Sequence, residues 1–147
     1  MTRKIILTAA MAILSSTLLA HVALAAGTTF HSPLVAVSGE GSGTVEGATT
    51  SVQGESVIQG EVAVQGLAAN TEYTIVRAID LNADGICDGS GGVVTLGTLT
   101  TSAAGAGASH FVRHSPIPSG TASDILFLVK LGDDTVLQSE CLTVTVK

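Results

Sequence analysis

The clearest chemical signal in the sequence is a run of oxygen-bearing side chains at alternate positions, followed by a glycine that permits a sharp bend. Carboxylate and amide oxygens in the order D-x-[DN]-x-[DN]-G are typical ligands of a calcium loop. In such a loop Ile86 would add a backbone carbonyl, and Asp88 a direct or water-mediated ligand. The pattern predicts a calcium site with five ligands: Asp80, Asn82, Asp84, Ile86 and Asp88.

The same loop departs from an EF-hand at its twelfth position, where Gly91 stands in place of the bidentate glutamate. Its flanks are also strand-like, so we expect calcium without the EF-hand fold. The alternative is a solvated turn, because Asp, Asn and Gly populate loops for purely local reasons. If calcium binds, the expected affinity is in the weak range of about 10⁻⁴–10⁻³ M, where the ion stiffens a loop.

The N-terminus has the form of an export signal. A basic start with Arg3 and Lys4 precedes a mostly apolar stretch over residues 5–20, and Ala23-Leu24-Ala25 has the small-x-small form of a cleavage site. An uncleaved anchor is the alternative. We therefore predict a signal peptide over residues 1–25 and a secreted or periplasmic protein.

Cysteine usage agrees with export. Cys87 and Cys141 are the two cysteines of the chain, and an even pair in an exported domain usually forms a disulfide. The alternative is two inert buried thiols. A bridge would fasten the acidic loop, which contains Cys87, to the last expected strand.

Charge excludes several classes of partner. Removal of residues 1–25 leaves four Lys and Arg against 12 Asp and Glu, a formal net charge of −8. This composition offers no basic patch for nucleic acid or for anionic lipid. No second apolar run approaches the roughly 20 residues of a spanning helix, so we expect no membrane span after signal cleavage.

The remaining chain reads as an all-β protein of about seven to nine short strands, because alternation with period two recurs between turn-forming segments. We divide it into a Gly/Thr-rich N-terminal strand region, 26–54, and a β-sandwich core, 55–147. A six-residue repeat around Gly54, Gly60 and Gly66 is too short for a β-helix and is interpreted as a strand pair. The expected strands fall within residues 34–38, 45–57, 61–65, 73–78, 93–101, 108–113, 125–129, 135–140 and 142–146.

Two expectations concern the core. Residues 125–129 form a continuous apolar run, which is typical of a strand covered on both faces. The chain has no Trp, one Tyr and three Phe, so we expect a thin core built from Val, Ile, Leu and Ala, with the disulfide compensating.

Within residues 57–111, Gly66-Leu67, Thr71-x-Tyr73 and the run Leu96-Gly97-Thr98-Leu99 follow one another in a recognisable order. This order resembles small exported bacterial β-sandwich proteins of the immunoglobulin-like, chordin-type or Cu/Zn superoxide-dismutase-like kind. The resemblance implies an immunoglobulin-like Greek-key β-sandwich.

Dismutase activity is not carried over with that resemblance. The strand over residues 73–77 has no histidine where the His-x-His ligands of that family would be expected. His110 and His114 are four residues apart, which on a strand separates them by roughly 13 Å. We interpret both as surface histidines.

Motifs of other enzyme classes, such as a nucleophile elbow, a zinc-protease helix or a phosphate-binding loop, do not occur in the sequence. We therefore expect a non-enzymatic exported protein with a structural or interaction role, with calcium optional. One alternative is a subunit of an extracellular filament, in which residues 27–54 add as a strand to the exposed edge of a neighbour. A metalloenzyme of the dismutase-like class is the other, disfavoured alternative.

Overall fold

The computed structural model of the chain describes residues 28–52 and 55–146, and the regular elements in this part are all β-strands. The predicted signal peptide lies outside these residues, in which no helix is long and apolar enough to cross a membrane. The prediction of an all-β chain with seven to nine strands is confirmed. The nine strands are β1 (Thr29–Ala36), β2 (Ser42–Val52), β3 (Glu55–Gln65), β4 (Glu72–Asp80), β5 (Val93–Thr100), β6 (Gly107–His114), β7 (Ala122–Leu131), β8 (Asp134–Ser139) and β9 (Leu142–Thr145).

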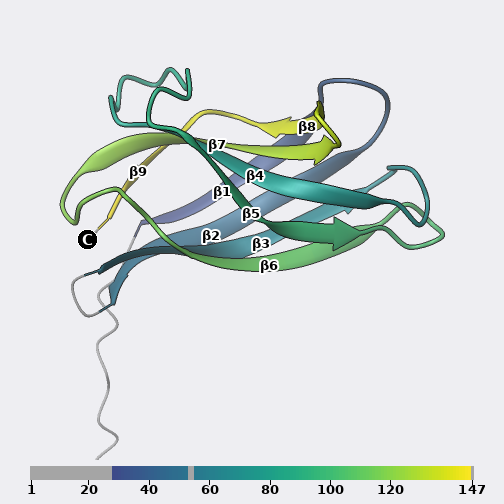
Figure 1. The fold of residues 1–147 in the computed structure, drawn as a ribbon, viewed down its shortest axis with the longest axis horizontal. Coiled ribbons are helices and arrows are strands. Elements are labelled where there is room, and N and C mark those ends of the chain that lie inside the picture. Colours follow the sequence, from purple (N-terminus) through teal and green to yellow (C-terminus); the bar gives the residue numbers. More distant parts are fainter. Residues whose placement is uncertain (1–27, 53–54, 147) are drawn as a thin grey trace, which may run out of the picture.

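The strands form one antiparallel sheet in the order β5-β4-β7-β8-β1-β2-β3-β6, and β9 pairs with the first part of β7. The sheet folds over on itself, so β4 and β7 face β2 and β3 across the core (Figure 1). Its two ends, β5 and β6, thereby approach each other. The result is a nearly closed barrel with the two layers of a sandwich. Its finer assignment as an immunoglobulin-like Greek key stays a prediction.

The described part of the N-terminal region belongs to the same sheet. β1 pairs with β2 on one side and with β8 on the other. β2 also pairs with β3 along its whole length, from Ser42 opposite Gln65 to Val52 opposite Glu55. In β1 the side chains of Phe30, Ser32 and Leu34 alternate inward, as the period of two predicts. Residues 28–52 are therefore built into the sheet.

Aromatic packing joins the two layers. The ring of Phe127 on β7 lies 5.3 Å from that of Phe30 on β1 and 5.7 Å from that of Phe111 on β6, measured between ring centroids. Phe30 and Phe111 reach over two glycines, Gly47 on β2 and Gly60 on β3, which face each other in register. The core consists mainly of Val, Ile and Leu, as expected, but the three phenylalanine rings are also buried in it and pack against one another.

The expectation that residues 125–129 are covered on both faces is also only half right. Ile125, Phe127 and Val129 are buried against the core. Leu126 and Leu128 point to the other face and are half-buried. The run is apolar on both faces although only one of them lies in the core.

We predict that Gly47→Ala and Gly60→Ala each destabilise the fold by about 1–3 kcal/mol. A Cβ at Gly47 would lie 2.7 Å from Phe30 Cζ and would collide with the Gln59 carbonyl oxygen, and one at Gly60 would lie 2.9 Å from Phe111 Cζ. Chemical denaturation measures the loss. Gly97→Ala is the matched control, because a Cβ there meets nothing within 4 Å. Equal stability of all three variants would contradict this account of the core.

Candidate acidic site at the end of β4

The predicted calcium loop lies between β4 and β5 and begins with the last residue of β4. It returns to the sheet through two main-chain hydrogen bonds, from Gly91 N to the Ile79 carbonyl and from Ile79 N to the Gly92 carbonyl. Gly85 has a φ of 81°, the left-handed conformation that the sequence pattern required of it. The loop is thus closed at its base and turns at the expected glycine.

Asp80 organises the loop from its base. Its side chain is only 2% exposed, and Oδ1 accepts hydrogen bonds from Asn82 N at 2.9 Å and from Ser90 Oγ at 3.0 Å. Oδ2 accepts one from Asp88 N at 3.4 Å. The Asn82 N–H is the largest cause that lowers the pKa of Asp80 below its ordinary value, and burial opposes it. Asp80 is therefore held in its ionised form.

Asp124 is the acidic residue that the sequence pattern missed. It lies on β7 directly opposite Asp80 and is fully buried. Its Oδ2 accepts a hydrogen bond from Gly85 N at 2.6 Å, and its Oδ1 accepts one from the Thr143 hydroxyl on β9. Asp124 therefore ties the bend of the loop to two strands. Its sequence signal, a lone charge at the start of an apolar run, does not reveal the strand pairing that brings it to Asp80.

The predicted disulfide is confirmed between Cys87 and Cys141, whose Cα atoms are 5.6 Å apart. It joins the loop to the two-residue break between β8 and β9. The loop is thereby fixed at three places: at its base, at Asp124 and at the disulfide. Disulfides are typical of proteins in an oxidising compartment.

The structure brings together only part of the predicted ligand set. Asp80 and Asp88 share a hydrogen bond, whereas Asp84 and Ile86 are exposed. The Asp84 carboxylate accepts a hydrogen bond from Ile86 N at 2.9 Å, and that of Asp88 accepts one from Ser90 N at 2.8 Å. In residues 28–52 and 55–146 no three His, Cys, Asp or Glu side chains are arranged to hold a metal ion. Calcium binding by this loop stays a prediction.

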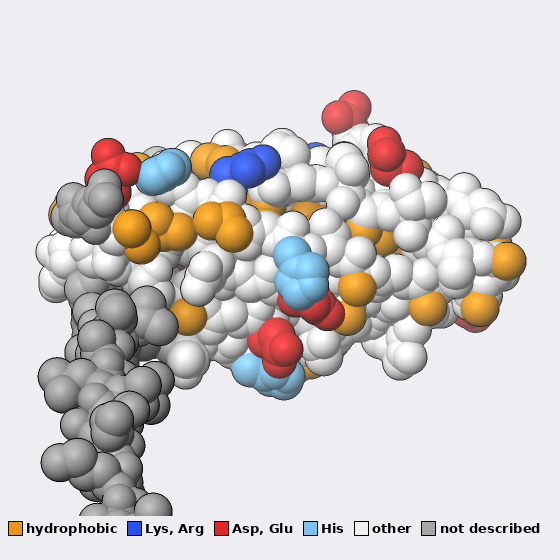
Figure 2. Space-filling view, turned by 90° about the horizontal axis from the view of Figure 1, so that it is seen from below, with side chains coloured by type: hydrophobic (Ala, Val, Ile, Leu, Met, Phe, Trp, Pro, Cys, Tyr) orange, Lys and Arg blue, Asp and Glu red, His pale blue; other side chains and the backbone are white. Residues whose placement is uncertain are grey.

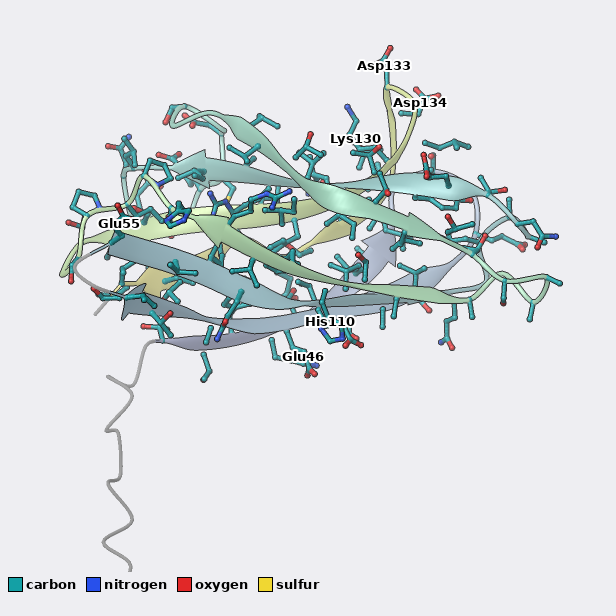
Figure 3. The ribbon with its side chains drawn as sticks, turned by 60° about the horizontal axis from the view of Figure 1, so that its bottom comes forward. Glu46, Glu55, His110, Lys130, Asp133 and Asp134 are labelled. Carbon is teal, nitrogen blue, oxygen red and sulfur yellow. A yellow bond between two sulfur atoms is a disulfide. The ribbon has the colours of Figure 1, made fainter. Side chains whose placement is uncertain are left out.

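The two histidines of β6 each contact a different glutamate. His110 Nε2 lies 2.9 Å from Glu61 Oε2, and His114 Nδ1 lies 3.0 Å from Glu55 Oε2. β6 runs unbroken through both histidines, so they do not converge. Figure 2 shows histidine and acidic side chains beside one another on this face, and Figure 3 shows His110 and Glu46 pointing outward from it.

A second group that sequence reasoning missed is Arg77, in the middle of β4. It is fully buried, and none of its three guanidinium nitrogens has a hydrogen-bond partner among the described residues. Desolvation by burial lowers its pKa from the ordinary value of an arginine to about 10, so the group still carries its charge at neutral pH. In the sequence Arg77 is one polar residue in a strand of alternating pattern, which gives no sign of its burial.

We predict that Asp80→Asn flattens the acid dependence of stability. A carboxyl group whose pKa is lower in the folded than in the unfolded protein stabilises the fold. The full gain is present when the pH is above the pKa of the unfolded state, and it is lost as the pH falls through the pKa of the folded state. The free energy of unfolding of the wild type should therefore fall toward that of Asp80→Asn below pH 3.8, the ordinary pKa of the group. Urea titrations across this range, with Asp133→Asn in the β7–β8 turn as control, test it. A constant difference would refute it.

Removal of the disulfide should destabilise the fold substantially. The bridge spans 54 residues of sequence, and closing a loop of this length is worth about 4 kcal/mol in the chain-entropy model. We expect the double variant Cys87→Ser, Cys141→Ser to unfold at the same denaturant concentration as the reduced wild type, and both well below the oxidised protein. Coincident curves for oxidised and reduced protein would contradict a stabilising role.

Comparison of the chain with protein-family models, curated proteins and solved structures finds no match. The resemblance to immunoglobulin-like, chordin-type and dismutase-like sandwiches therefore stays a prediction. What the structure establishes is the all-β fold, the disulfide and the hydrogen-bonded acidic loop.

Proposed function

We propose that the chain is an exported, non-enzymatic β-domain with a structural or interaction role, and that its acidic loop binds calcium. One observation carries the calcium part. Asp80 and Asp124 are both buried and lie opposite each other on paired strands. Among the described residues the ion pairs are two His–Glu pairs elsewhere, so neither aspartate has a cation beside it. A divalent cation would offset the repulsion between two such carboxylates.

The loop offers further oxygens next to this pair. Asp88 is in hydrogen-bond contact with Asp80 through its main chain, and the side chain of Asp84 lies at the exposed bend beside Gly85. The carboxylates of Asp84 and Asp88 each accept a local main-chain hydrogen bond through Oδ1, which leaves the other oxygen of each for an ion. Two exposed carboxylates are consistent with the weak affinity expected of a loop-stiffening site.

Burial also supports a non-enzymatic role for these aspartates. A general acid or base must come within hydrogen-bond distance of its substrate. Asp80 and Asp124 instead face strands, main-chain N–H groups and hydroxyls within the protein. Their geometry serves to position the loop. The disulfide to Cys141 supports export, because it requires an oxidising environment to persist.

The filament alternative depends on residues 27–54 adding to a neighbour. In this structure β1 lies between β8 and β2, and β2 lies between β1 and β3, so both edges of this segment are occupied. We therefore do not include strand donation by this segment in the proposal.

Calcium should raise the melting temperature of the oxidised protein. If the dissociation constant is about 10⁻⁴ M, calcium at a hundredfold higher concentration raises the free energy of unfolding by about 2.7 kcal/mol. This gain corresponds to a rise of several degrees in the melting temperature. We expect Asp84→Ala to abolish the shift, because it removes a predicted ligand whose only described hydrogen bond is local. Differential scanning calorimetry of chelator-treated protein, with and without calcium, measures it.

Two controls accompany this experiment. Magnesium at the same ionic strength should give a smaller shift, since it prefers a rigid octahedral site. Asp133→Ala should keep the full calcium shift, because Asp133 stands at the opposite end of β7 from Asp124 (Figure 3). A wild type that melts at the same temperature with and without calcium would defeat the calcium proposal.

A further inference from the structure

The two end strands of the sheet leave a seam between them. Among the strands of residues 28–52 and 55–146, β5 pairs with β4 alone and β6 pairs with β3 alone. They start side by side at the hairpin that joins them and then diverge, as Figure 1 shows. We define the seam as the space between the free edges of β5 and β6. Each edge presents main-chain N–H and C=O groups that no strand among the described residues covers.

The seam is also bordered by apolar side chains. Val93 on β5 is 64% exposed, and Val112 on β6 is 60% exposed. Natural sheets usually protect a free edge with charge, proline or a covering segment, because an apolar edge invites another strand. Exposed valines beside two free edges therefore mark the seam as a place where an extended segment can add.

Arg77 lies on the inner side of this seam. Arg77 is in register with Val94 of β5 and with Phe127 of β7. It lies between the buried residues Ile75 and Ile79, two positions from each, so all three side chains point to the core face of β4. Its guanidinium is therefore inside the fold, one strand away from the free edge. Because none of its three nitrogens has an acceptor in the part of the chain that the structure describes, the fold bears the cost of a buried cation without a counter-ion.

A second cation borders the same place. Arg113 on β6 is opposite the fully buried Ile58 of β3, so it projects from the inner face of the sheet, and yet it is exposed. Arg113 lies near the end of β6 that is farthest from the hairpin. Val94, the residue opposite Arg77, likewise lies near the end of β5 that is farthest from the hairpin, so Arg77 and Arg113 belong to the same end of the seam.

We propose that the seam receives an extended acidic segment of a partner protein, which adds as a β-strand to the free edge of β6 and directs a carboxylate toward Arg77. Strand addition supplies main-chain hydrogen bonds, and an inward side chain of the added strand enters the fold beside Val94. The carboxylate class follows from charge, since a guanidinium binds a carboxylate through two parallel hydrogen bonds. This inference rests on the proposed interaction role and is independent of calcium.

The probe is a fluorescein-labelled nine-residue peptide of alternating Thr and Val with glutamate at its centre, compared with the same peptide carrying glutamine. Fluorescence anisotropy against the full exported, oxidised chain measures both affinities. We expect the glutamate peptide to bind at least about tenfold more tightly. Hydrogen exchange should show new protection of main-chain amides along β6. Absence of binding by both peptides, or equal binding, would overturn the proposal.

The variants locate the effect. Arg77→Met should abolish the preference for glutamate and should raise the melting temperature, because it removes an unpaired buried charge. Arg113→Gln, at an exposed site, should weaken the binding of the glutamate peptide by about threefold. This variant tests the role of positive charge at the seam even if Arg77→Met fails to fold. Lys130→Met, on the outer face of β7, is the matched control and should change neither affinity.

Two outcomes would reject specific parts of the inference. If the preference for glutamate survives in Arg77→Met, Arg77 is not the receptor. If sedimentation of the protein alone shows a dimer with protected amides along β6, the occupant is a second copy and the acidic partner is wrong. Failure of peptide binding together with a positive calcium shift would overturn this inference and leave the calcium proposal intact.

Discussion

The stacking of Phe30, Phe127 and Phe111 is the contact on which the folded sheet depends. The rings come from β7, β1 and β6, none of which neighbours another in the sheet order, so their packing draws together parts of the sheet that do not pair. Rings of this size fit only because Gly47 and Gly60 leave the facing strands bare at that point. A core with few aromatic residues thus concentrates them where they connect the most strands, and the aliphatic side chains fill the space on either side.

The local sequence pattern predicts most of the strands. The residues that it did not reveal, Asp124 and Arg77, owe their surroundings to the pairing of strands that are distant in the sequence. Alternation and apolar composition located segments within β3 to β9, and two cysteines allowed a single intramolecular pairing. Asp124 was not predicted because it meets Asp80 only when β7 pairs with β4. The two aspartates are 44 residues apart in the sequence. Arg77 was not predicted for a related reason, since a polar residue in an alternating strand gives no indication of which face will be enclosed.

The acidic loop and the seam represent two ways of handling buried charge. At Asp80 and Asp124, main-chain N–H groups and hydroxyls donate hydrogen bonds to the buried carboxyl groups, so the protein itself replaces part of the water they lose. At Arg77 no acceptor among the described residues performs that task. The acidic loop was visible in the sequence because its candidate ligands stand at alternate positions within one short segment. The seam lies between strands that are far apart in the sheet order, and no local pattern records it.

The position of the disulfide has a consequence for how the chain matures. Synthesis begins at the N-terminus, so Cys87 emerges long before Cys141 and remains a free thiol while β5 to β8 are being made. The chain contains no third cysteine, so every wrong intramolecular bridge is excluded and the only mistaken partner is another molecule. The disulfide can therefore lock the acidic loop only after synthesis has passed Cys141, and until then a thiol of another molecule is the competing partner of Cys87.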